Sequence, residues 1–237
     1  MALDMQSIYL LASGGSRAME QLDTTTNNIA NVDTTGFKKM MIEEMSQRID
    51  QNGLDSNHLF VFPRFKQSLI FEEQGALKQT GVPLDLAIEG KGFFVIQKGN
   101  QQLLSRDGHF FISPDGFLVN KDGNRILDKE GQPIALENNQ VTITSDGKIY
   151  QQGEEVASFQ IVDYDKVTPV GANYYQPSGA KRAAKFTLYQ GYLESSNVNP
   201  VLEMTSLITA QRRFEIYNNL IKSIDQLNQK TNEIAKA

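Results

Sequence analysis

Apolar residues at both ends of the chain recur at alternating spacings of three and four, and this spacing predicts a helix with one apolar face at each end. The first stripe consists of Ile8, Leu11, Gly15, Ala18, Leu22, Thr25, Ile29 and Val32. The second consists of Leu207, Ala210, Phe214, Tyr217, Ile221, Ile224, Asn228, Thr231 and Ala235, and it is widened by Met204, Ile208, Leu220, Leu227 and Ile234. Matching stripes at the two ends predict helices that pair, and they are typical of a subunit that polymerises.

The first predicted helix contains residues that form helices poorly. Gly14 and Gly15 interrupt it, and residues 24–28 are threonines and asparagines, which lose rotamer freedom or compete for backbone hydrogen bonds in a helix. An isolated helix of this composition is marginal, so its order must come from packing. We therefore expect both termini to become ordered on assembly. The alternative is an ordinary helical hairpin packed inside a monomer.

The middle of the chain has the pattern of short β-strands separated by glycine turns. Residues 83–96 predict a buried strand, a glycine turn and a second strand. Four glycines then follow at near-equal intervals and predict a meander of hairpins, namely Gly108, Gly116, Gly123 and Gly131. Further strands are predicted at residues 141–144, 149–150 and 158–162. The predicted fold class is α+β, with long N- and C-terminal helices pairing as a coiled coil and a central all-β domain of short hairpin strands.

These patterns divide the chain into four predicted parts. They are an N-terminal helix of the assembly core (1–38), a variable connecting region (39–74), a β-rich body domain (75–195), and a C-terminal helix that pairs with the N-terminal one (196–237). In the connecting region, residues 41–49 predict a helix that breaks at Asn52 and Gly53. The apolar run 59–62 is followed by Pro63, which cannot continue a central strand.

Composition argues against several classes of function. The 237-residue chain has a net charge of -5 with its basic residues thinly spread, so it lacks the positive surface of a nucleic-acid-binding protein. It has no cysteine and only two histidines, which argues against disulfides, thiol chemistry and a nitrogen- or sulfur-ligated metal site. The apolar run 8–12 is too short to cross a bilayer, and residues 1–7 carry no basic cluster of a cleavable signal. We expect no nucleic-acid partner and no membrane insertion.

An enzyme is the first rival class. A cell-wall hydrolase, for example, needs two carboxylates that face one cleft. The available carboxylates lie beside turns or strand ends, where a solvated side chain is the default: Glu72, Glu73, Asp85, Glu89, Glu154 and Glu155. The Asp-Gly turns lack the ligand order of a calcium loop, and Gly90-Lys91-Gly92 lacks the spacing of a phosphate loop. We expect no enzyme activity, no cofactor, and no catalytic, cofactor-binding or metal-binding residue.

Several motifs carry more specific information than these patterns. Residues 27–38, NNIANVDTTGFK, pass from the first helical stripe into Asn, Asp, Thr and Gly residues that favour turns and stop a helix. This string resembles the N-terminal signature NNIAN-x-x-T-x-GFK of the bacterial flagellar rod and hook family. Residues 190–204, QGYLESSNVNPVLEM, and the AQRRFE string at 210–215 resemble the C-terminal block of that family. Residues 83–96 and the SRDGHF string at 105–110 resemble the block that opens its β-domain.

The resemblance implies a structural subunit of the flagellar basal-body rod, which polymerises into the shaft that transmits torque from motor to hook and is needed for motility. Its partners would be further copies of itself, other flagellar rod proteins and, during secretion, the flagellar type III export apparatus. Its location would be the basal body within the periplasm, reached without a cleavable signal. The residues expected in the assembly interface are Ile8, Leu11, Leu22, Asn28, Ile29, Asn31, Phe37, Leu207, Phe214, Tyr217, Ile221 and Ile224.

Two alternatives remain beside the enzyme. Within the family, only 46 residues lie between Phe37 and Leu84, which favours a proximal rod subunit over a distal rod or hook-type paralogue. Outside the family, a soluble coiled-coil adaptor or export chaperone with an attached β-domain would show a similar pattern. Such a protein would keep both helices folded in the free chain, so the order of the termini in the monomer separates the two classes.

Overall fold

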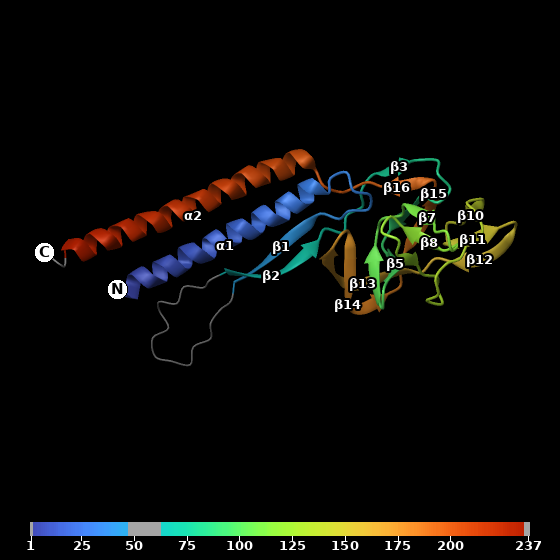
Figure 1. The fold of residues 1–237 in the computed structure, drawn as a ribbon, viewed down its shortest axis with the longest axis horizontal. Helices are drawn as coiled ribbons and strands as arrows, with labels where there is room; N and C mark the ends of the chain where they lie inside the picture. The colour runs from blue at the N-terminus through green and yellow to red at the C-terminus, as the bar shows by residue number, and fades with distance from the viewer. Residues whose placement is uncertain (1, 47–62, 235–237) are drawn as a thin grey trace. The chain divides into compact units, whose positions relative to one another are not determined.

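The computed structural model describes residues 2–46 and 63–234, and it divides the chain into two compact units (Figure 1). The first, here called the helical unit, comprises Met1–Ala30, Met40–Ser68 and Asn199–Ala237. The second, here called the β-body, comprises Asn31–Lys39 and Leu69–Val198. The chain therefore passes between the two units four times, because each unit is assembled from separate stretches of sequence.

The helical unit contains the two terminal helices, which lie side by side in Figure 1. Helix α1 spans Ala2–Ala30, and helix α2 spans Pro200–Ile234. The start of α2 follows the rules for helix N-termini. The Asn199 side chain accepts hydrogen bonds from the amides of Val201 (3.1 Å) and Leu202 (3.2 Å), and Pro200 occupies the first helical position, where a missing N–H costs nothing.

The connection after α1 forms strands, and the predicted helix over residues 41–49 is wrong where the structure describes it. Strand β1 spans Met40–Ser46 and pairs with β2, Pro63–Ile70, in a two-stranded sheet. The residues of β1 favour a helix locally, but they pair with β2 and the Asn28 side chain bonds to the backbone of Met40. These tertiary contacts outweigh the local helix propensity. Pro63 stands at the first position of β2, where strands tolerate proline. The apolar run 59–62 lies outside the described residues.

The β-body is built around a seven-stranded sheet in the order β13-β14-β6-β5-β9-β8-β7, with β13 also pairing with β5. Its strands are β5 (Phe93–Lys98), β6 (Gln101–Ser105), β7 (Phe110–Ile112), β8 (Leu118–Asn120), β9 (Arg125–Ile126), β13 (Ile161–Gly171) and β14 (Tyr174–Arg182). A three-stranded sheet contains β10 (Val141–Ile143), β11 (Lys148–Gln151) and β12 (Glu154–Ser158). Two smaller sheets pair β4 (Leu86–Gly90) with β15 (Phe186–Gln190), and β3 (Leu77–Gln79) with β16 (Tyr192–Glu194).

The body has a dense apolar core. Phe94, Phe110 and Phe159 are almost completely buried, and the ring centroid of Phe94 lies 5.0 Å from that of Phe110 and 5.7 Å from that of Phe159, both edge to face. This geometry is the one that aromatic rings prefer. A second buried cluster lies around Phe93, Leu104 and Tyr175. The central β-rich fold is confirmed, and the described residues therefore have the expected α+β content.

The predicted meander is correct for only part of the body. Strands β7, β8 and β9 follow one another as antiparallel neighbours, and Gly116 and Gly123 have positive φ angles of 80° and 77° in the turns between them. Gly108 plays a different role from the predicted one. A Cβ atom there would lie 1.7 Å from the carbonyl oxygen of Leu86, so the glycine permits close approach of two backbones rather than a hairpin turn.

Candidate functional site

The apolar stripe of α2 forms the less exposed side of that helix. Its members from Leu207 to Asn228 are buried or half-buried, namely Leu207, Ala210, Phe214, Tyr217, Ile221, Ile224 and Asn228, whereas Thr231 is exposed. On α1, Gly15, Ala18, Thr25 and Asn28 are buried, and Ile8, Leu11, Leu22 and Ile29 are half-buried. Within the helical unit the structure therefore brings together the predicted residues of both helices.

Glycine gives α1 and α2 room to approach each other. A Cβ atom at Gly14 would lie 2.5 Å from the ring of Tyr217, which no ordinary contact allows. At Gly15 the corresponding distance to the Tyr217 Cβ is 3.6 Å, an ordinary van der Waals contact. The residues that weaken α1 as an isolated helix thus accommodate the aromatic ring of its partner.

Asn28 is a buried polar residue of the helical unit whose side chain makes three hydrogen bonds to other elements. Its side-chain amide donates to the Met40 carbonyl (2.9 Å), and its oxygen accepts from the Met40 amide (2.8 Å). The same amide nitrogen donates to Glu203 Oε2 at 3.2 Å. Asn28 is 1 % exposed, so it joins α1, β1 and α2 inside the chain. Its expected contact across a subunit boundary stays a prediction.

A second set of apolar side chains on α2 is exposed. Met204, Ile208, Leu220 and Leu227, which widen the predicted stripe, are 45 to 63 % exposed. Val201, Leu202 and Ile216 are also exposed, as are Leu10 and Met19 on α1. Exposed large apolar side chains in this number are more typical of a subunit that contacts partners than of a soluble monomer.

A buried charged triad lies in the β-body. Lys38 Nζ donates to Glu194 Oε1 at 2.6 Å, and Arg106 Nε donates to Glu194 Oε2 at 2.9 Å. All three side chains are at most 3 % exposed. The backbone amide of Gly75 also donates to Glu194 Oε1, at 2.9 Å. One carboxylate therefore forms an ion pair with each of two buried cations.

The remaining donors of the triad are bonded to backbone carbonyls. Lys38 Nζ donates to the Glu73 carbonyl at 2.8 Å. The Arg106 guanidinium donates to three further carbonyls, those of Ile88, Gly90 and Gly92. Burial lowers the pKa of Lys38 below 10.5, and the charge of Glu194 opposes that shift. Hydrogen bonds of this kind make buried charges tolerable, because they replace the water that the charged groups have lost.

Asn197 adds a second polar connection beside the triad. Its side-chain oxygen accepts from the Lys39 amide at 2.7 Å, and its nitrogen donates to the carbonyls of Phe71 and Glu73, both at 2.8 Å. The segments 31–39, 69–75 and 194–198, which connect the β-body in sequence to the helical unit, are thus bonded to one another inside the β-body.

Two predicted interface residues lie in the β-body. Phe37 is 4 % exposed, and its amide donates to the Thr34 carbonyl at 3.3 Å. Asn31 accepts hydrogen bonds from the hydroxyl and the amide of Thr34, both at 3.1 Å, in a local turn. Neither contact involves a second subunit, so a role for these residues between subunits stays a prediction.

The triad and Asn197 were missed by sequence reasoning, although each lies inside a motif that it singled out. Lys38 ends the NNIANVDTTGFK string, Arg106 belongs to SRDGHF, and Glu194 and Asn197 belong to QGYLESSNVNP. A charged residue inside an otherwise turn-forming or strand-forming motif is the available signal. Its partner cannot be read from the sequence, because Lys38 and Glu194 are 156 positions apart.

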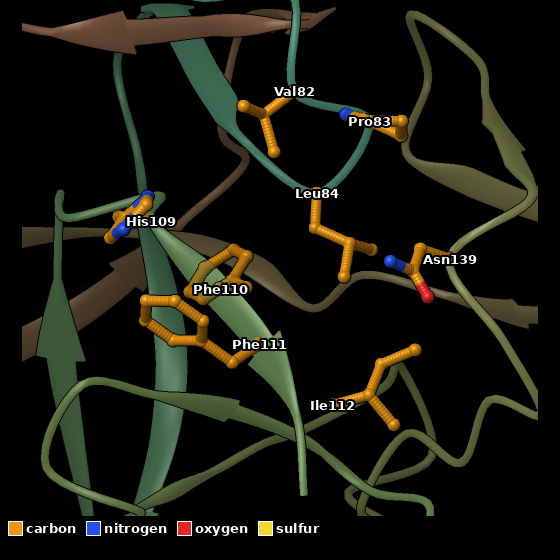
Figure 2. Close-up of a pocket in the computed structure, with 8 residues that line it drawn as sticks. All are labelled: Val82, Pro83, Leu84, His109, Phe110, Phe111, Ile112 and Asn139. Carbon is orange, nitrogen blue, oxygen red and sulfur yellow. The ribbon is translucent and has the colours of Figure 1, made fainter.

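The β-body also has a mostly apolar hollow, shown in Figure 2. It is lined by Val82, Pro83, Leu84, His109, Phe110, Phe111, Ile112 and Asn139. The His109 ring packs against Phe111, with the centroids 4.5 Å apart, and His109 Nδ1 lies 2.6 Å from Asp85 Oδ1. Among the lining residues, His109 and Asn139 have polar side chains, and the others are apolar.

Within the described residues, no group of three or more histidine, cysteine, aspartate or glutamate side chains is placed to hold a metal ion. None of the described helices is sufficiently long and apolar to cross a membrane.

Comparison with known proteins shows three matches along the chain. The family model described as "Flagella basal body rod protein" matches residues 8–38, "Flagellar hook protein FlgE/F/G D1 domain" matches 87–151, and "Flagellar basal body rod FlgEFG protein C-terminal" matches 189–234. The flagellar basal-body rod protein FlgF of Mesorhizobium japonicum is 32% identical, over 88% of this chain and 89% of the relative. FlgF of Caulobacter vibrioides is 32% identical over 93% and 94%, and FlgG of Bacillus subtilis is 30% identical over 94% and 96%.

The chain belongs to the flagellar basal-body rod protein family. This rod-family protein is a structural subunit of the basal-body rod, as the resemblance of its motifs predicts. Each of the three matched segments contributes one member of the buried triad: Lys38 is the last residue of the first, Arg106 lies in the second, and Glu194 lies in the third. The family motifs thus meet at one carboxylate inside the β-body.

Proposed function

We propose that this rod-family protein polymerises through its terminal helices, which pair as a coiled coil and bury their exposed apolar side chains against further copies and other rod proteins. The observation that carries the proposal is that α2 has large apolar side chains on more sides than the one that packs against α1. Ile208 and Leu227, for example, are both exposed and lie on different sides of the helix. A helix that is apolar on more than one side requires more than one neighbour.

Open polymerisation explains why these surfaces differ. A helical filament needs a heterologous contact, in which one surface of a subunit meets a different surface of the next copy. The exposed large apolar side chains differ between the two helices: Leu10 and Met19 are exposed on α1, and several large aliphatic residues are exposed on α2. In the proposed rod these helices carry torque from motor to hook, as the resemblance implies.

The chain fits a FlgF-type, proximal subunit better than a FlgG-type one. The alignments with FlgG of Bacillus subtilis and of Caulobacter vibrioides extend over 254 and 262 residues, more than the 237 of this chain. Those relatives therefore contain inserted residues that this chain lacks. The FlgF alignments extend over only 224 and 233 residues, so they need fewer inserted residues than the FlgG alignments.

Export by the flagellar type III apparatus and a final position within the periplasm complete the proposal. A cysteine-free chain needs no oxidative step to fold after transport. Helices of marginal intrinsic stability suit a subunit that travels unfolded and becomes ordered at its destination.

Charge placed on an exposed apolar side chain of α2 tests the assembly directly. Ile208→Asp puts a carboxylate on a side chain that is 51 % exposed, so the free chain tolerates it, whereas a subunit contact must desolvate it. We expect Ile208→Asp to abolish incorporation into rods and swimming, and the neighbouring control Thr209→Asp to have less effect. Normal swimming of the Ile208→Asp strain would refute the proposed contact.

The side of α2 that packs against α1 has its own test. Phe214→Asp and Ile221→Asp place a charge between α1 and α2 and should block incorporation while the β-body stays folded. Hydrogen exchange on the natural chain at low concentration then separates a polymerising subunit from a soluble adaptor. Fast exchange in both helices with protection in the β-body supports ordering on assembly, and protected helices in a monomer favour the adaptor.

A further inference from the structure

Residues 186–198, here called the closing segment, complete two sheets of the β-body. Strand β15 pairs over its whole length with β4, from Phe186 opposite Gly90 to Gln190 opposite Leu86. Strand β16 pairs with β3 in the same antiparallel manner. In the described part of the chain, each of these sheets has two strands only, so the closing segment supplies half of both.

The closing segment also supplies the only carboxylate of the triad. Lys38 and Arg106 reach Glu194 at 2.6 and 2.9 Å, and both cations are buried. Without Glu194, the β-body would have to bury two positive charges beside the unpaired Gly75 amide. Breaking a buried ion pair in this way is strongly destabilising, because the remaining charge has lost both water and its partner.

Polar side chains of the same segment bond to further strands. Gln190 accepts from the Ile143 amide (3.1 Å) and donates to the Val141 carbonyl (2.9 Å), both in β10. The Leu188 amide donates to the Ser145 carbonyl at 2.9 Å, and its side chain is buried in the main core. The closing segment therefore joins β3, β4, β10 and the segment containing Lys38, which are far apart in the sequence.

We propose that docking of residues 186–198 is the step that completes the β-body. The seven-stranded sheet, here called the central sheet, then reaches its stable form only when the chain is present through Val198. A chain that emerges from the ribosome N-terminus first then stays open until most of its 237 residues have been made. This consequence rests on the export route of the proposed function. Such a delay keeps a partial chain from folding before it passes through the type III apparatus.

Refolding of the full, natural chain tests the order of events. The chain is diluted from urea at a concentration where it stays monomeric, and amides are labelled with short exchange pulses. The Leu127 amide, bonded to Val95 in the central sheet, should gain protection in the same kinetic phase as the Leu188 amide of the closing segment. Protection of Leu127 in an earlier phase, while Leu188 still exchanges freely, overturns the proposal.

A single-atom change gives an equilibrium test in the full chain. Glu194→Gln keeps the shape of the side chain and removes its charge. We expect native-state protection of the Leu127 and Leu188 amides to fall by the same factor, at least about tenfold. Loss confined to Leu188 overturns the proposal. Glu155→Gln, in an exposed pair with Lys148, is the matched control and should leave both amides unchanged.

The outcome is independent of polymerisation. Both measurements use monomers and report on amides of the β-body, whereas the Ile208→Asp test reports on rods and swimming. If Glu194→Gln prevents folding altogether, the refolding experiment on the natural chain still decides. Failure of the closing-segment proposal and failure of the assembly proposal are therefore distinguishable.

Discussion

Replacing Lys38 with methionine tests how the charge of Glu194 is shared. Methionine keeps an unbranched side chain as far as the ε position and lacks the ammonium group. In the natural chain that group donates to Glu194 Oε1 at 2.6 Å and to the Glu73 carbonyl at 2.8 Å. Glu194 keeps the guanidinium of Arg106 and the amide of Gly75, each at 2.9 Å. The carboxylate therefore stays neutralised and hydrogen-bonded when Lys38 is lost.

The expected cost follows from these contacts. Two hydrogen bonds of the charged ammonium group are lost, and each contributes about 1.5 to 3 kcal/mol to the free energy of unfolding. Much of that loss is offset, because burial lowers the pKa of Lys38 and the methionine no longer has an ammonium group to desolvate. We expect Lys38→Met to lower the free energy of unfolding by about 2 kcal/mol. Glu194→Gln leaves two buried cations without a counter-charge and should lower it by about 3 kcal/mol or more.

Urea unfolding of the β-body measures both values. Tyrosine fluorescence and far-UV circular dichroism can follow the transition, because the chain has 8 tyrosines and no tryptophan. Lys148→Met is the control, since its pair with Glu155 is exposed and should leave the urea transition almost unchanged. If Lys38→Met proves as costly as Glu194→Gln, then Arg106 does not hold the carboxylate in the way these contacts imply.

Three further predictions concern the helices and the pH dependence. Gly15→Ala should stabilise the helical unit by about 1 kcal/mol through helix propensity, whereas Gly14→Ala should lower its stability because the new methyl group meets the Tyr217 ring; equal thermal shifts for the two variants would contradict this. Burial raises the pKa of Tyr174 to about 12, above the value of 10.0 in the unfolded chain, so the stability that is present below pH 10.0 is lost as the pH rises toward 12. The free energy of unfolding of Tyr174→Phe should therefore depend less on pH between 10 and 12 than that of the natural chain. The same pH dependence in both proteins would argue against the shift. Asn28→Ala should lower the stability of the helical unit in assembled rods by about 2 kcal/mol, because two hydrogen bonds to the backbone of β1 are lost; an unchanged urea concentration for the disassembly of rods would show that these bonds contribute nothing.

Local spacing made the helices and many of the strands predictable. The side of α2 that faces α1 repeats at three and four residues, because neighbours on a helix face depend on local geometry alone. Strand ends were also close, with residues 141–144 predicted and β10 observed at Val141–Ile143. Predicted residues 158–162 instead divide between the end of β12 and the start of β13, since a continuous alternating pattern does not reveal where the chain changes sheets.

The candidate site was predictable only in part. The paired residues of α1 and α2 followed from the stripes, but Asn28 was assigned to a helix end and its bonds to β1 were not foreseen. The helix predicted over residues 41–49 failed for the same reason. Met40 and its neighbours favour a helix locally, and only the pairing of β1 with β2 turns them into a strand.

From the sequence alone came the two helical stripes, the β-rich middle and the motifs that point to the flagellar rod family, because each is carried by residues close together in the chain. The tertiary structure decided that Lys38, Arg106 and Glu194 form one buried triad. Their attraction depends on distances that arise only when three distant segments fold together, and those distances leave no periodic trace in the sequence.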